Sequence, residues 1–333
     1  MPTGRWAGKT VVVTGGSGFI GSHFVEQLLE RGARVLCLYR RDNRRVLPQL
    51  PDTDRLTTLR MDLRDEAAMR RVFAEAPGGV DAVFHCAVVS GTVEARRDQA
   101  ARILDDNMRA VSNILDCARR HDTPETVLLG SSDIYAASAR TDPIPEDDDF
   151  RRRMHYAPDG YYLSKCYAEI LAEAYRHQHG MRIFVPRLTS VYGARDNFEP
   201  DTDRVVPSMF AKVLAGQSIE IWGDGSQTRT YMYVSDLVRG ILRMVEADKH
   251  QTFNIGTTET VSVLRLAQLV SAALGEPERI TFDPGRSGGR PSRTLDVSRL
   301  NSVIDFQPRS LREGLEETVR WYRRHRGPAA TAR

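Results

Sequence analysis

The sequence has few cysteines and places none of them in a metal-binding pattern. Its four cysteines are scattered over 333 residues and form no Cys-x-x-Cys pair, so the sequence predicts neither a zinc site nor any other metal site. Cys37, Cys86 and Cys117 lie in apolar stretches, which is typical of small buried hydrophobic residues in a reducing compartment.

Long apolar runs and a large excess of one charge are also absent. Nowhere do 18 uncharged apolar residues follow one another, and residues 1–9 contain no apolar signal core, which predicts a cytoplasmic protein without a membrane segment. Lys and Arg number 47 against 44 Asp and Glu. Because no basic stripe with interleaved aromatic residues is present, the sequence indicates no nucleic-acid partner.

The first half of the chain alternates short β-branched runs with amphipathic helical stretches. We expect strands at residues 10–14, 33–39, 55–61, 80–85, 126–131 and 181–186, and helices at 19–31, 98–120 and 161–179. This alternation is typical of βαβ units. The predicted fold class is therefore α/β, with a Rossmann-type doubly wound parallel sheet.

The second half has smaller elements, expected at residues 206–215, 218–222, 235–247, 263–274 and 310–324. They predict a smaller C-terminal α/β lobe that binds substrate. We expect a dinucleotide-binding domain at residues 1–190 and this lobe mainly at 191–326, with some segments returning to the first domain. Residues 327–333 are expected to be a disordered tail.

A glycine-rich turn joins the first expected strand to the first expected helix. It reads Thr14-Gly15-Gly16-Ser17-Gly18-Phe19-Ile20-Gly21. Glycines at 15, 18 and 21 allow a tight turn and close approach of the backbone to a pyrophosphate, while the helix that begins at Phe19-Ile20 offers its N–H groups and positive dipole end. A tight turn without a ligand is the alternative, but its place after the first of several βα units favours a dinucleotide site.

The end of the second expected strand bears on the choice of cofactor. An acidic residue there is typical of NAD-binding folds, and an arginine accommodates the 2′-phosphate of NADP. The run here is Leu38-Tyr39-Arg40-Arg41, with no acid before Asp42. NADP(H) is therefore predicted over NAD(H), with Arg40 and Arg41 as phosphate contacts; surface arginines at a strand end are the alternative. Asp62 and Leu63, after the third strand, are expected near the adenine.

A Tyr-x-x-x-Lys pattern lies on the helix expected at residues 161–179. Residues four apart share a helix face, so the Lys165 ammonium can favour ionisation of the Tyr161 phenol, which can then exchange a proton with a substrate hydroxyl as hydride moves. Such a pair is often only a surface contact. Ser131 and Ser132 strengthen the catalytic interpretation, because they end a strand at the carboxyl edge of the sheet, where ligands bind.

These motifs together resemble the extended short-chain dehydrogenase/reductases, also called NAD-dependent epimerase/dehydratases, over essentially the whole chain. Further matching segments are Asn107, Tyr192-Gly193, Tyr233-Val234-Ser235-Asp236 and Phe253-Asn254-Ile255-Gly256. The resemblance implies Ser131, Tyr161 and Lys165 as a catalytic triad, Lys165 also contacting the cofactor. It further implies that Arg229 contacts nucleotide phosphates and that the two long helices pair into a homodimer.

Within this family the sequence is similar to the GDP-L-fucose synthase group of GDP-sugar epimerase-reductases. The similar segments include Leu129 to Tyr135, Asp196-Asn197-Phe198, Val205-Val206-Pro207 and Trp222-Gly223-Asp224-Gly225. This similarity implies a GDP-linked sugar as substrate. The residues then expected in the substrate site are Ser132, Ser190, Arg204, Val206, Trp222, Arg229 and Arg293.

Three positions depart from that group. Asp133 stands where fucose synthases have a cysteine, and Arg204 where they have a histidine; those two residues form the acid/base pair for epimerisation. Ser190 replaces an asparagine that many relatives have near the substrate diphosphate. Since an arginine is effectively never deprotonated, Arg204 can supply charge but not shuttle a proton, whereas Asp133 can act as a base.

The resulting hypothesis is NADP(H)-dependent 4-keto reduction, epimerisation or both, on a GDP-hexose. One alternative is a 4,6-dehydratase with Asp133 as the base at C5, and another is a non-redox isomerase or ring-form mutase on the same scaffold. A dinucleotide-binding sensor or scaffold is the non-enzymatic alternative. The intact set of Ser131, Tyr161 and Lys165 argues against it.

Overall fold

The computed structural model describes residues 4–43, 46–135, 143–152, 158–199, 202, 204–286 and 291–326, except the side chains of residues 93 and 326. The chain divides into two compact units. Unit 1 comprises the described residues of Met1–Ala136, Asp149–Leu188 and Ile241–Phe253, and unit 2 those of Ala137–Asp148, Thr189–Gly240 and Asn254–Arg333. The predicted disordered tail, 327–333, lies outside the described residues.

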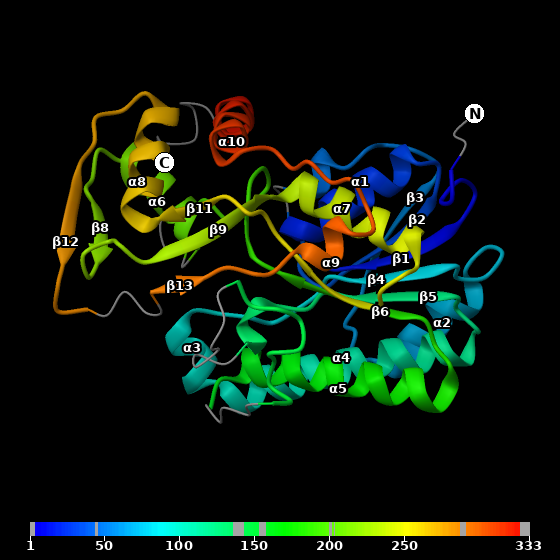
Figure 1. The fold of residues 1–333 in the computed structure, drawn as a ribbon. Coiled ribbons are helices and arrows are strands. Elements are labelled where there is room, and N and C mark those ends of the chain that lie inside the picture. The colour runs from blue at the N-terminus through cyan, green and yellow to red at the C-terminus, as the bar shows by residue number, and fades with distance from the viewer. Residues whose placement is uncertain are drawn as a thin grey trace. The chain divides into compact units, whose positions relative to one another are not determined.

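Unit 1 is built on a seven-stranded sheet in the order β10-β6-β5-β4-β1-β2-β3 (Figure 1). The strands β3, β2, β1, β4, β5 and β6 lie side by side in this order, and each pairs in parallel with its neighbour. This is the order 3-2-1-4-5-6 of a doubly wound dinucleotide-binding sheet. The predicted Rossmann-type fold is thus confirmed. The strands are β1 (Thr10–Thr14), β2 (Arg34–Tyr39), β3 (Leu56–Arg60), β4 (Ala82–His85), β5 (Glu125–Leu128), β6 (Ile183–Leu188) and β10 (Thr252–Ile255).

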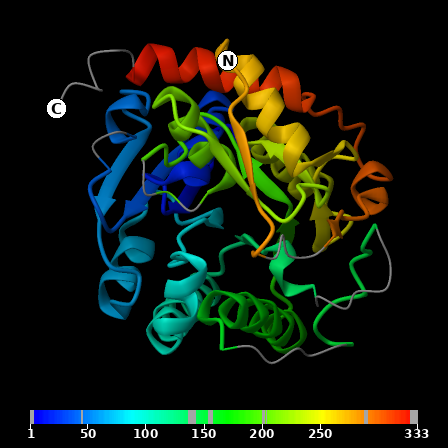
Figure 2. The same cartoon turned by 90° about the vertical axis from the view of Figure 1, so that its left-hand side faces the viewer.

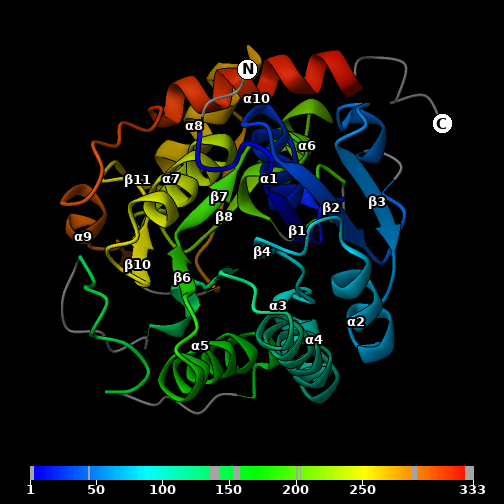
Figure 3. The same cartoon turned by 90° about the vertical axis from the view of Figure 1, so that its right-hand side faces the viewer.

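Helices cover both faces of this sheet. Figure 3 shows α1 (Phe19–Glu30) on one face, and α2 (Glu66–Glu75), α4 (Ala100–Arg120) and α5 (Gly160–His179) side by side on the other. Unit 1 also contains the shorter helical segments η1 (Leu47–Gln49), α3 (Val93–Asp98) and η2 (Ser132–Ile134).

The sheet is apolar on both faces because both are covered. On the α1 face, the rings of Phe24 and Phe84 lie 4.9 Å apart. On the opposite face, Val12 packs with Phe73 of α2 and Ile114 of α4 in one buried cluster. The central strands therefore have near-continuous hydrophobic sequences, which is the signal that predicted them.

Unit 2 is organised around β9 (Thr228–Tyr233), which pairs with three short strands, β7 (Ser190–Tyr192), β11 (Thr260–Ser262) and β13 (Ser292–Arg293). β8 (Ile219–Trp222) and β12 (Ile280–Asp283) form a separate parallel pair. Figure 2 shows α10 in red beside α8 in gold, and the two helices pack together. The helices are α6 (Val205–Leu214), α8 (Val263–Leu274), α9 (Ser298–Asn301) and α10 (Leu311–Arg326), with α7 (Val234–Ala247) passing into unit 1.

Three expectations about local structure need correction. The helix expected at 98–120 begins two residues later, as α4, and a separate helix that was not expected, α3, ends at Asp98. The strand expected at 126–131 ends at Leu128. Beyond it Gly130 lies close to β6: its backbone N–H donates to the Pro186 carbonyl oxygen at 2.8 Å, and a Cβ there would come 2.9 Å from the same oxygen. Cys86 is partly exposed, whereas Cys37 and Cys117 are buried as expected.

None of the helices that the structure describes is both long enough and apolar enough to cross a membrane.

Candidate active site

The glycine-rich turn connects β1 to α1 as the sequence predicts. Gly15 has a φ of +65°, and a Cβ there would lie 2.8 Å from Ala87 Cα, in the loop after β4. A Cβ on Gly21 would overlap the Gly15 carbonyl oxygen. Gly18 precedes α1 without a side-chain cap, so Phe19, Ile20 and Gly21 form the first turn of a helix whose N-terminus is open to an anion.

Two exposed arginines, Arg40 and Arg41, follow β2 directly. A third, Arg60, ends the neighbouring strand β3, donates from Nε to the Arg40 carbonyl oxygen at 3.3 Å and lies 3.7 Å from Asp42. The sequence prediction missed Arg60, because only strand pairing brings it beside Arg40. Binding of a phosphate by these arginines stays a prediction.

The expected adenine contacts have protein partners of their own. Arg64 donates to both carboxylate oxygens of Asp62, at 3.0 and 2.7 Å, and this hydrogen bonding lowers the pKa of Asp62 to about 2. The Leu63 carbonyl oxygen accepts from Asn113 at 2.8 Å. Contact of Asp62 or Leu63 with a cofactor stays a prediction.

The Tyr-x-x-x-Lys pair lies on α5, and α5 is placed by local contacts at its start. The Asp159 side chain caps it by accepting from the Tyr162 backbone N–H at 2.9 Å. Gly160 allows α5 to approach α4, since a Cβ there would overlap the Ala100 carbonyl oxygen. This fixes the helix face that carries Tyr161 and Lys165.

Lys165 is anchored beneath the Tyr161 ring. Its Nζ donates to the Leu129 carbonyl oxygen at 2.6 Å and lies 5.6 Å from the centre of the Tyr161 ring. Burial lowers the pKa of Lys165 to about 8. The ammonium is thus close enough to stabilise a Tyr161 phenolate.

Ser131 and Ser132 are buried in the turn that follows β5. The Ser131 hydroxyl oxygen accepts from the Asp133 backbone N–H at 3.1 Å and caps η2, which packs against α5. In a parallel sheet the carboxyl ends of β1 and β5 share one edge. Unit 1 therefore brings the glycine turn, the two serines and the Tyr161–Lys165 pair to the same edge of the sheet.

Asp133 and Tyr161 share a partner that sequence reasoning missed. Arg96, on α3, places its guanidinium carbon 4.3 Å from the centre of the Tyr161 ring and its Nη1 3.3 Å from Asp133 Oδ2. Nothing in the spacing of the sequence links α3 to these two residues. Asp133, expected to act as a base, is therefore ion-paired.

Two buried polar groups support the same edge. His85, at the end of β4, forms a hydrogen bond between Nδ1 and Thr14 Oγ1 at 2.8 Å, and burial lowers its pKa to about 3. The Asn107 side chain bonds both the N–H and the carbonyl of Val89, at 2.8 and 2.9 Å, and donates to Ser164 Oγ at 3.2 Å. These bonds fix the loop after β4 against α5.

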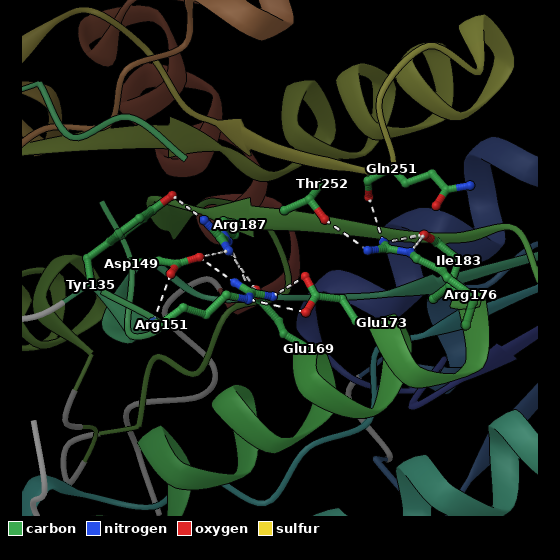
Figure 4. A network of polar contacts seen from close by, with 10 residues as sticks. All are labelled: Tyr135, Asp149, Arg151, Glu169, Glu173, Arg176, Ile183, Arg187, Gln251 and Thr252. Atoms are coloured by element: carbon green, nitrogen blue, oxygen red, sulfur yellow. Dashed lines mark hydrogen bonds and ion pairs between the residues drawn. The ribbon is translucent and has the colours of Figure 1, made fainter. Parts of the chain in front are cut away.

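A buried ion-pair network lies beyond η2 (Figure 4). Arg187, at 1% exposure, donates to Glu169 on α5 at 2.7 Å, to Asp149 at 2.7 Å and to the Tyr135 hydroxyl at 3.0 Å. Arg151 pairs with the same Asp149. Because Tyr135 directly follows η2, the network supports the turn that carries Ser131 and Asp133.

In unit 2, pairing of β9 with its neighbours gathers three expected substrate residues. Arg293 on β13 is in register with Arg229 on β9, so two arginines lie side by side. Ser190 on β7 is in register with Tyr231, which is also on β9. Two adjacent guanidinium groups are suited to bind a diphosphate.

The other expected residues of unit 2 have different surroundings. Trp222 is 45% exposed at the end of β8, with the Arg286 guanidinium 5.0 Å from the centre of its ring. Val206 is buried in the apolar core of the unit. Arg204 pairs with Asp196 at 2.6 Å and donates to the Val191 carbonyl oxygen at 2.9 Å. Asp133 and Arg204 belong to different units, so their joint role stays a prediction.

A doubly wound sheet with a glycine turn, beside a serine and a Tyr-x-x-x-Lys helix, is the arrangement of the short-chain dehydrogenase/reductases. The model of the NAD dependent epimerase/dehydratase family matches residues 11–256. The chain belongs to this family and is an enzyme of the extended short-chain dehydrogenase/reductase type, which confirms the resemblance seen in the sequence.

Individual relatives differ in how similar they are. A dTDP-4-dehydro-6-deoxy-D-allose reductase from Streptomyces bikiniensis is 50% identical over 98% of this chain and 99% of its own length. GDP-L-fucose synthase from Escherichia coli K12 is 27% identical over 94% and 96%. Among solved structures, a dTDP-glucose 4,6-dehydratase from Streptomyces venezuelae with NAD and TYD bound is 26% identical, with a TM-score of 0.81, covering 96% of this chain and 98% of that one.

Proposed function

We propose that the chain is a nucleotide-sugar reductase that converts a dTDP-linked 4-keto-6-deoxyhexose to the 4-hydroxy sugar with NADPH. The observation that carries this proposal is the meeting of Tyr161, Lys165 and Ser131 at the edge of the sheet that holds the glycine turn. The reductase from Streptomyces bikiniensis, at 50% identity, supports the reaction and the nucleotide.

The nucleotide is where this proposal departs from the expectation of a GDP-sugar. That expectation rested on similarity to fucose synthases, and the Escherichia coli member is 27% identical. A relative at 50% identity is named for a dTDP-linked sugar, and it therefore outweighs the fucose synthases. Because its name specifies a 6-deoxy-D-allose, a substrate of the D-allo configuration is the first sugar to test.

The residues of unit 1 fit a nicotinamide dinucleotide. Side chains at Gly15 and Gly21 would fill the turn, and α1 has no side-chain cap to occupy its N-terminus. When bound, the dinucleotide supplies the hydride for C4 of the sugar. Arg40 and Arg41 after β2, together with Arg60, favour NADPH because their charges suit a 2′-phosphate.

Tyr161 donates its phenolic proton to the sugar oxygen as that oxygen gains negative charge, and becomes a phenolate. The Lys165 ammonium, 5.6 Å from the ring centre, stabilises the phenolate. The Ser131 hydroxyl donates a hydrogen bond to the same sugar oxygen. The carbonyl thus gains one hydride at carbon and one proton at oxygen.

Reduction without epimerisation is favoured over the other reactions of this scaffold. Epimerisation at C3 or C5, like 4,6-dehydration, needs a group that removes a proton from a ring carbon. Asp133 is held in an ion pair with Arg96, and Arg204 is held in an ion pair with Asp196. We therefore assign Asp133 to positioning of the sugar and Arg204 to charge.

The substrate is expected to contact unit 2 through its nucleotide. Arg229 and Arg293 would bind the diphosphate and Trp222 would lie near the base, with Ser190 and Ser132 as further contacts. Val206, as a core residue, would act only through its backbone or by shaping the site. The homodimer and the cytoplasmic location also stay predictions.

Product analysis tests the proposal. Purified protein is incubated with dTDP- and GDP-linked 4-keto-6-deoxyhexoses and with the parent hexoses, with NADPH, NADH or neither, and Tyr161→Phe serves as the blank. A dTDP product heavier by two hydrogens is expected. Loss of water from a parent hexose would establish a dehydratase, an isomer of unchanged mass an epimerase or mutase, and reduction of the GDP-sugar alone would refute the assigned nucleotide.

A further inference from the structure

We propose that Arg96 is a positioning residue that tunes the proton affinity of Tyr161 and holds Asp133 in place, an inference that rests on the proposed role of Tyr161 as proton donor. Arg96 belongs to none of the motifs that define the family in this sequence. Its role is inferred from its contacts in the structure alone.

The Arg96 guanidinium lies between an aromatic ring and a carboxylate. Its carbon is 4.3 Å from the centre of the Tyr161 ring, within the range of a cation–π contact. Its Nη1 is 3.3 Å from Asp133 Oδ2, and its Nε donates to the Gly91 carbonyl oxygen at 3.3 Å. Three segments of unit 1 thus fix its orientation, and its side chain is 23% exposed.

The charges around Tyr161 have opposing effects. Arg96 from α3 and Lys165 from α5 lie at its ring, and each favours the phenolate while it carries its positive charge. The Asp133 carboxylate, next to η2, offsets part of the charge of Arg96. His85, facing Lys165 from β4, contributes no charge at neutral pH because burial keeps its imidazole neutral. Arg96 and Asp133 are therefore predicted to shift the ionisation of Tyr161 in opposite directions.

The test is a titration of Tyr161 by NMR in the full chain without substrate. Tyrosine is labelled with ¹³C at Cζ, and the Tyr161 signal is assigned by its loss in Tyr161→Phe. Removing a cation at this distance from a partly exposed site is expected to raise the midpoint of ionisation by about 0.5–1 pH unit in Arg96→Ala and in Arg96→Gln. Asp133→Asn, which leaves the cation uncompensated, is expected to lower it by a similar amount.

Arg97→Ala is the matched control, because Arg97 is the exposed neighbour of Arg96 on the same helix, and it is expected to leave the midpoint unchanged. Arg96→Gln keeps most of the side-chain length, so it replaces Arg96→Ala if the alanine variant does not fold. Unchanged midpoints in the Arg96 variants, or shifts of the same sign in the Arg96 and Asp133 variants, would overturn the proposal. Since no substrate is present, this result is independent of whether the chain reduces the proposed sugar.

Discussion

Replacing Arg187 by methionine is expected to destabilise unit 1, because two buried carboxylates share this one buried cation. Arg187 is 1% exposed, and the Asp149 and Glu169 side chains are 5% and 2% exposed. Methionine fills much of the volume but donates no hydrogen bond, so both carboxylates lose a partner. Removing one member of a buried ion pair costs about 3–5 kcal/mol. Arg151 remains paired with Asp149, which places the expected loss near 3 kcal/mol.

Thermal unfolding followed by circular dichroism measures this loss. Unit 1 has about 190 residues, and for a unit of this size 1 kcal/mol corresponds to roughly 2–4 °C in Tm. Arg187→Met is thus expected to lower the Tm of unit 1 by roughly 6–12 °C. Arg109→Met is the control, since Arg109 pairs with Asp105 at 2.9 Å but both side chains are more than half exposed; its Tm should change by less than about 4 °C. Equal, small changes in the two variants would refute the reasoning.

Three further predictions concern the site. Gly21→Ala should weaken dinucleotide binding and lower Tm, because its methyl group overlaps the Gly15 carbonyl oxygen; calorimetric affinity equal to that of the parent would contradict this. Arg40→Asp should narrow or reverse the preference for NADPH over NADH, and equal affinities of the parent for both would contradict the assigned cofactor. The pKa of Lys165 is lowered to about 8, below its ordinary value of 10.5. Between pH 8 and 10.5 the unfolded chain therefore binds more protons than the folded chain. Denaturant titrations should therefore show the parent gaining stability relative to Lys165→Met, by on the order of 2 kcal/mol, as pH rises from 8 to 10.5; a constant difference would contradict the shift.

The secondary-structure elements beside the site that local sequence determines were predicted well. β1 has the predicted bounds, and α1 ends at Glu30, one residue before the predicted end. Both follow from the apolar pattern of adjacent residues and from the glycines that separate them. The meeting of the glycine turn with Ser131 and α5 also followed from the sequence, because parallel strands end at one edge of their sheet.

Contacts between distant segments were beyond the reach of sequence patterns. Arg96 precedes the helix expected at 98–120, and its partners come from a turn after β5 and from α5. The strands β7 and β13, of three and two residues, each pair with β9, and strands this short have no periodicity that could indicate them. The base of the nucleotide is hard to predict for a related reason, since base recognition depends on a few side chains whose positions a motif does not give.

The central claim is hydride transfer to C4 of a dTDP-linked sugar, with Tyr161 supplying the proton. The most direct measurement uses NADPH with deuterium at C4 of the nicotinamide and a ready-made dTDP-4-keto-6-deoxyhexose. NMR of the product is expected to show deuterium at C4 of the sugar, and no label from deuterated solvent at C3 or C5. Tyr161→Phe should reduce the rate by about 10²–10⁴-fold. Solvent deuterium at C3 or C5, absence of label at C4, or an unchanged rate in Tyr161→Phe would contradict the account.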